Sequence, residues 1–580
     1  MHNDLLPVKS AKWDWGLVAT LPILLWLISD RWMFFPVHCW FDPWFNLGIF
    51  LNYEYLSSLH EKTYFITRLP SIIPHFFAYK FLTPYAAVVA TTLLKFYLCI
   101  IPLYWILIEL TKNRLASLLP ILVLSFFPYY LSSIGWNYVD GLGIAYISLA
   151  TAFFVAACKK ENWKLWLFLA GFAQALMLFN YLFVAIFIVI QVGVFIVYNK
   201  IHTQRSLFTC FLFLGAGGFF CTACLSSFSY YFNGTILFFL SQIQAALQLA
   251  SLSHFVSGKS SAWYVPFREW FPTSGWLFLT GISFFLGMNY LVKHIKNFKA
   301  RSSSFLDLDT LVIFQFLAAC FVYIVLEFLG FNFLQFFYTA NYLLPFGILA
   351  LGVILSKNIP SLKYENWIIG AILFSFCIVF SLKGNAAAIG KKWDIISTIS
   401  FMGCLFFSAL FFQSSKEKFK ILYSALSVLL VVIGFDRLTV KKNDYPYKDH
   451  SDHDLVVTLH RYIKNNIPSK NSYMFWCNVQ ADGLGSFFQP LSATYMNSGV
   501  LAGVFSNIFP EIYEEGFSEK TKSTIILLSS DPDAIEKAEE ALKQKGYSWD
   551  IVKQEKFVLG EKQFLMLAFL LKPIETKNEN

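Results

Sequence analysis

Long apolar stretches alternate with short polar segments along the first three quarters of the chain. Most of these stretches are about 17–25 residues long, which is the length of a helix that crosses the hydrocarbon core of a bilayer. The pair 163–179 and 181–198 is the least clearly separated, because Asn180 is the only break between them. We predict about thirteen spans, at residues 15–35, 86–110, 114–134, 139–158, 163–179, 181–198, 207–228, 274–292, 310–329, 338–356, 366–382, 395–412 and 420–436.

Two longer segments between the spans, 35–85 and 230–273, mix aromatic and polar residues. Within them, the apolar residues of Asn46–Leu59 and Gly234–Leu252 recur at helical spacing. Such a pattern is typical of amphipathic helices that lie in the plane of the membrane interface.

The pattern changes at about Lys441, after which charge rises and long apolar runs stop. The spacing predicts two helices and two separate strands, followed by a closing hairpin, at 454–465, 533–545, 472–477, 524–529 and 557–571. We therefore predict an α-helical polytopic membrane domain over residues 1–440 and a small soluble α/β domain over 441–580.

Composition excludes a soluble protein, because 57% of the residues are hydrophobic and only 14% are charged, against about 25% charged residues in soluble domains. The formal net charge is +9, but the lysines lie in short loops rather than in one patch, which argues against nucleic-acid binding. Alternate loops hold most of the Lys and Arg, so the positive-inside rule places the N-terminus in the cytoplasm. Thirteen spans then place the C-terminal domain outside the cytoplasm, in an inner (plasma) membrane protein, and one miscounted span would reverse that placement.

Most of the ten cysteines lie inside apolar spans, where cysteine behaves as a small buried hydrophobic residue. Cys221 and Cys224 form a CxxC pattern within a span, for which packing is the favoured interpretation. Cys39 and Cys477 would both lie on the outer side, and the sequence leaves open whether they pair.

Two acidic residues stand where predicted spans meet the outer surface. Asp42 lies in an aromatic segment, Trp40-Phe41-Asp42-Pro43-Trp44, and Asp140 lies in the short turn Trp136–Gly141, where it is expected to open the helix of the span at 139–158. Each could cap a helix, since Asp is a favoured N-cap and Pro a favoured first helical residue. A carboxylate in such apolar surroundings is costly unless it meets a cation, a metal or a substrate hydroxyl, so catalysis is the alternative interpretation, and the two roles are compatible.

The run Phe41-Asp42-Pro43-Trp44-Phe45-Asn46, together with Arg68-Leu69-Pro70 and Asp140, resembles the pattern of GT-C fold glycosyltransferases. These multispan enzymes use polyprenyl-phosphate sugar donors and include protein O-mannosyltransferases and lipid A aminoarabinose transferases. The run from Phe41 also resembles the first-loop motif of oligosaccharyltransferases, but the tail lacks their WWDxG motif. The resemblance therefore implies transfer of a single sugar or small glycan to an envelope lipid, glycan or protein, with Asp42 as the base and Asp140 assisting through acceptor or metal contacts.

Transfer from a lipid phosphate also needs cations, or a divalent metal ion, at the leaving group. For the phosphate we favour Arg68 first, because Arg binds phosphate in a bidentate manner. Lys95 lies midway along the second span, where a charge is costly, and it could pair with Asp42, Glu54 or a phosphate, or simply order the helices through a salt bridge. Glu327, near the outer end of its span, is a weaker case of the same kind. The remaining cationic candidates, for which snorkelling to the interface is the alternative, are Lys391, Lys392 and Arg268.

The segment Asp449–Asp454 contains two histidines, but its spacing matches no metal template, so we interpret it as a solvated linker and N-cap. A transporter or flippase of lipid-linked substrates is the alternative function. It is disfavoured because the two halves show no repeat and few charges lie within the spans. A receptor anchored by the spans would need only one or two of them.

Overall fold

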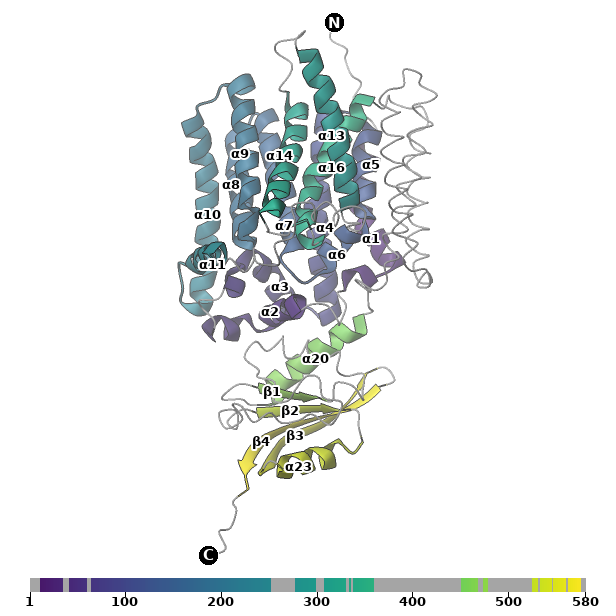
Figure 1. The fold of residues 1–580 in the computed structure, drawn as a ribbon, viewed down its shortest axis with the longest axis vertical. Helices are drawn as coiled ribbons and strands as arrows, with labels where there is room; N and C mark the ends of the chain where they lie inside the picture. Colours follow the sequence, from purple (N-terminus) through teal and green to yellow (C-terminus); the bar gives the residue numbers. More distant parts are fainter. Residues whose placement is uncertain are drawn as a thin grey trace, which may run out of the picture. The chain divides into compact units, whose positions relative to one another are not determined.

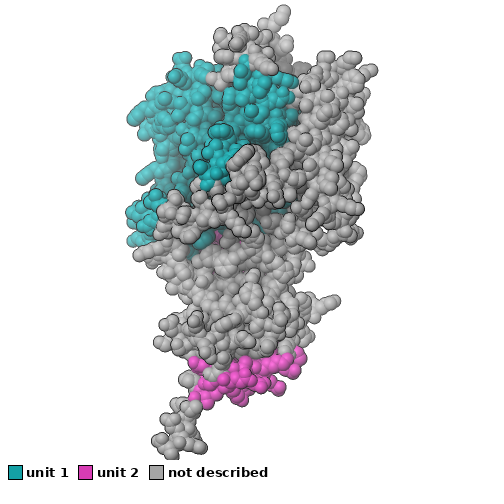
Figure 2. Space-filling view, in the orientation of Figure 1, with its two compact units in different colours: residues 1–33, 61–71, 91–445 teal, residues 34–60, 72–90, 446–580 magenta. Residues whose placement is uncertain are grey.

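The computed structural model describes residues 11–34, 41–59, 64–251, 277–298, 307–329, 333–334, 337–358, 450–467, 473–477, 524–529, 532–544, 546–559 and 562–574. The chain divides into two compact units, coloured in Figure 2. The first unit comprises residues 1–33, 61–71 and 91–445, and the second comprises 34–60, 72–90 and 446–580. The second unit thus contains two segments of the first outer loop besides the C-terminal region. The boundary near residue 441 stays a prediction from composition.

The described part of the chain contains seven helices that are long and apolar enough to cross a membrane. All seven coincide with predicted spans, and several run side by side in Figure 1. The chain is therefore an α-helical polytopic membrane protein. The seven cover Pro84–Thr111 (α4), Asp140–Lys159 (α7), Trp163–Asn180 (α8), Leu182–Thr203 (η3, α9 Ala185–Tyr198 and η4), Leu207–Asn233 (α10), Leu308–Phe328 (α14) and Tyr338–Lys357 (α15 Phe337–Ala340, η5 and α16 Leu344–Asn358).

The pair of spans that the sequence separates least clearly is two helices. Helix α8 ends at Asn180, and Tyr181 then adopts an extended backbone (φ −157°, ψ 109°) before the next helix starts. Residues 163–198 therefore contribute two spans rather than one, which settles the least certain point in the number of spans within the described part of the chain.

Two predicted spans differ from the simple pattern. The span 114–134 is a broken pair, α5 (Arg114–Ser125) and α6 (Pro128–Gly135), bent by 62°, because Pro128 has no backbone N–H to continue the helix. The first span is shorter than predicted, since α1 covers Ala11–Ile28. Helix α13 (Leu277–Phe298) overlaps the predicted span 274–292, but it is not among the seven candidate spans. The predicted spans 366–382, 395–412 and 420–436 lie outside the described residues.

The amphipathic segments predicted in the two outer loops are Asn46–Leu59 and Gly234–Leu252. They fall largely within helices α2 (Phe41–Leu59) and α11 (Phe239–Ser251). The first loop contains a further helix, α3 (Leu69–Phe81), that was not predicted.

The C-terminal region contains the predicted α/β elements. Helix α20 (His450–Asn466) is followed by β1 (Tyr473–Cys477), β2 (Thr524–Ser529), α23 (Ala534–Gln544), β3 (Tyr547–Leu559) and β4 (Lys562–Pro573). The four strands form one sheet in the order β1-β2-β4-β3, with β1 and β2 parallel and the other neighbours antiparallel. Apolar residues of β2, β4 and α23 form its core, with Ile525, Leu527, Leu542, Leu567 and Phe569 almost fully buried.

Candidate functional site

A buried pair of opposite charges lies within the apolar helices of the first unit. Lys95, midway along α4, is 1% exposed, and Asp140, the first residue of α7, is fully buried. The two side chains interact electrostatically, and the Lys95 Nζ also donates a hydrogen bond of 3.1 Å to the carbonyl oxygen of Ile134. The sequence predicted that Asp140 opens a helix, which is confirmed, but the structure gives Lys95 an acidic neighbour other than Asp42 or Glu54.

The start of α7 holds this pair in place. The N-terminus of a helix carries a partial positive charge, which favours a carboxylate at that position. Gly141 is required there, because a Cβ atom would lie 2.9 Å from Cδ of Lys95 and 3.0 Å from the Ser133 carbonyl oxygen. The hydroxyl groups of Tyr323 and Tyr342 also interact electrostatically with Asp140.

Arg68 lies in an aromatic cage next to these residues. Its guanidinium carbon is 4.8 Å from the ring centre of Phe65, 5.0 Å from that of Tyr138 and 5.4 Å from that of Tyr181. Tyr181 in turn stacks on Tyr342 at 6.1 Å with an interplanar angle of 16°. Since Tyr342 interacts with Asp140, a continuous series of contacts joins Arg68 to the charge pair. Cation–π contacts hold a guanidinium in position without neutralising its charge, so Arg68 remains suited to an anion.

Two amides fix the loops that carry these side chains. Gln242, on α11, donates hydrogen bonds to the carbonyl oxygens of Thr67 (2.8 Å) and Phe179 (2.9 Å). Asn180 donates to the carbonyl oxygen of Val139, at 2.8 Å, directly before Asp140. Sequence reasoning did not identify Gln242, Asn180 or the two tyrosines as site residues. For the two amides the sequence did carry a signal, a polar side chain inside or beside an apolar run, because buried polar groups of this kind are usually hydrogen-bonded.

The remaining predicted site residues are Asp42, Glu54, Arg268, Lys391 and Lys392. Asp42 is the second residue of α2, which begins at Phe41, two residues before the predicted start at Pro43, so Asp42 lies within the helix rather than at its N-cap. Glu54, also on α2, forms an ion pair of 2.9 Å with Lys80, and both side chains are about half exposed. Glu327 accepts a hydrogen bond of 2.8 Å from the backbone N–H of Leu334, so it connects the last turn of α14 to that residue. Arg268, Lys391 and Lys392 lie outside the described residues.

The interpretation of His453 as part of a solvated linker is wrong. Helix α20 begins at His450, and His453 is 3% exposed. Its Nε2 lies 2.9 Å from the Tyr79 hydroxyl, and its ring contacts Phe34. Among the described residues, no group of three His, Cys, Asp or Glu side chains is placed to hold a metal ion.

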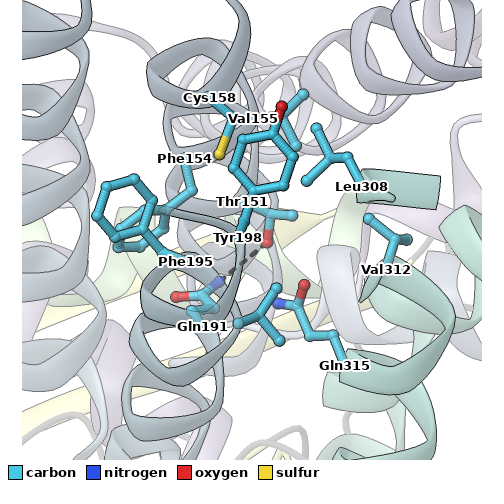
Figure 3. Close-up of a pocket in the computed structure, with 11 residues that line it drawn as sticks. Thr151, Phe154, Val155, Cys158, Gln191, Phe195, Tyr198, Leu308, Val312 and Gln315 are labelled. Atoms are coloured by element: carbon cyan, nitrogen blue, oxygen red, sulfur yellow. Dashed lines mark hydrogen bonds between the residues drawn. The ribbon is translucent and has the colours of Figure 1, made fainter. Parts of the chain in front are cut away.

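The first unit also contains a small cavity between its helices. It holds about 20 Å³ and is lined by residues of α7, α9 and α14, among them Thr151, Gln191 and Gln315. Figure 3 shows the Gln191 amide pointing to the Thr151 hydroxyl, to which it donates a hydrogen bond of 2.9 Å. A cavity of this size has room for about one water molecule, so it is not a substrate site.

No protein-family model matches the chain, and no curated protein matches its sequence. Solved structures to which the fold is similar include two states of one protein and a second protein. ArnT from Cupriavidus metallidurans bound to undecaprenyl phosphate has a TM-score of 0.47 and 12% identity, over 97% of this chain and 98% of that one. The apo state of the same protein has a TM-score of 0.43 and 12% identity, over 96% and 98%. The oligosaccharyltransferase AglB from Archaeoglobus fulgidus, in complex with an inhibitory peptide and a dolichol-phosphate, has a TM-score of 0.40 and 11% identity, over 90% and 70%.

Proposed function

We propose that the chain is a membrane glycosyltransferase that moves a sugar from a polyprenyl-phosphate donor to an acceptor of the cell envelope, on the extracytoplasmic face. The observation that carries the proposal is the buried pair of Lys95 and Asp140, with Arg68 in its aromatic cage beside it. Ionisable groups within membrane helices are costly and usually serve substrates or ions. The motif resemblance to GT-C glycosyltransferases supports the same reaction class.

The chemistry of the site suits a leaving phosphate. Glycosyl transfer from a lipid phosphate develops negative charge on the phosphate oxygens, which preorganised cations stabilise. Arg68 offers a planar fork for two of those oxygens, and Lys95 supplies a second cation. Asp140 balances the charge of Lys95 and fixes its position while the site is empty.

The role of Asp42 is a separate part of the proposal. The resemblance assigns it as the base that accepts the proton of the acceptor hydroxyl, which a positioned carboxylate can do. Replacing Asp42 with Asn should then abolish transfer while leaving donor binding intact. Unchanged transfer by a folded Asp42→Asn variant would remove Asp42 from this role.

The test is transfer of labelled sugar by the purified full chain in liposomes, supplied with a panel of undecaprenyl-phosphate sugars and an extract of envelope lipids and glycans. Loss of one preorganised electrostatic group usually costs about 10²–10³-fold in rate. We expect a loss of this order for Lys95→Met and for Asp140→Asn. The control is Lys543→Ala, which removes an exposed charge on α23 and should leave transfer unchanged.

A transporter would also use a buried Lys–Asp pair within its helices, so the same liposomes separate the two functions. Movement of the lipid-linked sugar across the bilayer without covalent transfer would replace the glycosyltransferase proposal. Full transfer by Lys95→Met would leave the pair with a purely structural role and would contradict the proposal.

A further inference from the structure

The second unit contains a cavity of about 290 Å³, close to the lower end of the range for small-molecule pockets, about 300–1,000 Å³. Its walls come from α2, α3 and α20, and all its lining residues belong to this unit. Neither Lys95 nor Asp140 is among its lining residues, and the glycosyltransferase proposal does not use it. Its lining residues are Phe50, Leu51, Asn52, Tyr53, Glu54, Phe76, Tyr79, Lys80, His460, Arg461, Lys464 and Asn465.

Asn52 gives the cavity a buried polar group. Its side chain is 5% exposed, and its Oδ1 accepts no hydrogen bond from any residue that the structure describes. The backbone of α2 leaves helical geometry at this residue (φ −129°, ψ 26°). A buried amide oxygen without a donor costs about 1–3 kcal/mol, so a ligand that supplies an O–H or N–H to Asn52 would gain affinity from it.

The rim of the cavity is positively charged overall. Lys80, Arg461 and Lys464 outnumber the single carboxylate of Glu54. Glu54 pairs with Lys80, and the Arg461 guanidinium donates to the Tyr79 and Leu82 carbonyl oxygens at 2.8 and 3.2 Å, which holds it at the edge of the cavity. Lys464 is exposed and lies one helical turn from His460, where it can contact an anion.

His460 and the aromatic residues form the neutral part of the lining. Burial, together with the nearby charges of Lys464 and Arg461, lowers the pKa of His460 to about 3, so the imidazole carries no charge at neutral pH. The rings of Phe50, Tyr53, Phe76 and Tyr79 supply flat apolar surface. A pocket of aromatic walls with a few polar groups orients a ligand that has one apolar face and several hydroxyls.

We propose that this cavity binds a sugar unit that carries a phosphate group. The ring hydroxyls would donate to Asn52 Oδ1, the C–H face would lie on the aromatic wall, and the phosphate would meet Lys464 and Arg461. Two sources share this chemistry, a soluble sugar phosphate and the phosphorylated sugar head group of a lipid.

The experiment measures binding to the full chain in nanodiscs by calorimetry. The soluble probe is glucose 1-phosphate. A short-chain phosphatidylinositol, titrated into the same nanodiscs, represents the lipid source, because its head group is a phosphorylated ring that carries several hydroxyls. We expect saturable binding of one of the two probes, and at least tenfold weaker binding of that probe to Lys464→Ala and to Asn52→Ala. Lys543→Ala, which also removes one exposed lysine charge, should bind like the wild type.

Either probe alone supports the proposal and identifies the source of the ligand. Two results overturn it. One is the absence of saturable binding of both probes. The other is binding of inorganic phosphate that is as tight as that of glucose 1-phosphate and is unaffected by Asn52→Ala. This result would show that the cavity recognises only the anion and not the sugar. Lys464 is exposed, so Lys464→Ala keeps the test valid if Asn52→Ala does not fold. Binding is measured without sugar transfer, so failure here and failure of the glycosyltransferase proposal are separate results.

Discussion

At the scale of single residues, His460 makes the second unit sensitive to pH. It is 1% exposed, and burial lowers the pKa of its imidazole from the ordinary 6.5 to about 3. Below pH 6.5 the unfolded chain therefore binds a proton at this position that the folded chain does not bind. The stability of the fold around α20 is complete above the unfolded pKa and falls as pH decreases toward 3.

We expect this loss to be about 2 kcal/mol between pH 7 and pH 5, since one unit of pKa difference corresponds to about 1.4 kcal/mol. Hydrogen exchange of peptides from α20, corrected for the intrinsic effect of pH, measures it. His460→Leu should remove most of the pH dependence, whereas His202→Leu, at an exposed histidine of the first unit, should not. Equal pH dependence in wild type and His460→Leu would rule out His460 as its cause.

The site residues differ in how far the sequence could predict them. Lys95 and Asp140 stand out because a charge beside apolar residues is rare and costly. Tyr181 and Tyr342 do not stand out among 29 tyrosines. Their role comes from the packing of helices that are far apart in sequence, and no local pattern reports such packing.

At the scale of elements, the local sequence pattern predicted the type and the bounds of a helix or strand correctly where only one pattern fitted. The strand predicted at 524–529 matches β2, and the charged amphipathic pattern at 533–545 matches α23 within one residue at each end. The strand predicted at 557–559 is only the end of β3, which starts at Tyr547. The polar residues of Tyr547–Lys556 interrupt the alternation of apolar residues by which a strand is recognised in the sequence. The strand is stabilised instead by its pairing with β4, along the register Tyr547↔Pro573 to Leu559↔Lys562.

Close packing of α8 against α10 depends on two glycines. A Cβ atom on Gly171 would collide with the Leu214 carbonyl oxygen, and one on Gly217 would collide with the Phe168 carbonyl oxygen. Small residues allow the backbones of membrane helices to approach in this way. The backbone atoms cannot move aside as a flexible side chain would.

We therefore expect Gly171→Leu to destabilise the first unit by at least about 1–3 kcal/mol, the usual cost of overpacking, and to lower its melting temperature in detergent. The matched control is Gly215→Leu on α10, where nothing lies within 4 Å of the added Cβ. Melting temperatures that fall equally for both variants would show that leucine in these helices, rather than the α8–α10 contact, causes the effect.

At the scale of the whole molecule, the structure gathers the predicted cytoplasmic loops at one end of the first unit. Glu109, at the end of α4, forms ion pairs with Lys112 (3.1 Å) and Lys160 (3.3 Å). The Arg205 guanidinium donates to the Ala157 carbonyl oxygen at 2.7 Å. These contacts join three basic loops that the charge bias assigned to one side of the membrane, and so they support the alternation of spans on which that assignment rests.

Helix α7 then relates the site to the orientation of the chain. It runs from Asp140 to Lys159, and Lys159 donates to the Glu109 carbonyl oxygen at 2.8 Å. Asp140 is thus at the end of α7 opposite the basic loops. The positive-inside rule places these loops in the cytoplasm, so the charge pair should be reached from the outer side.

Labelling of engineered cysteines in intact cells with a membrane-impermeant maleimide tests this orientation. Glu161→Cys lies in the exposed turn between α7 and α8, among the basic loops, and should react only after the cells are opened. Glu540→Cys lies on the exposed face of α23 and should react in intact cells if the predicted thirteen spans are correct. Wild type provides the background from native cysteines. Protection of both positions in intact cells would mean that the number of spans between α7 and α23 has the wrong parity, which would place the C-terminal region in the cytoplasm.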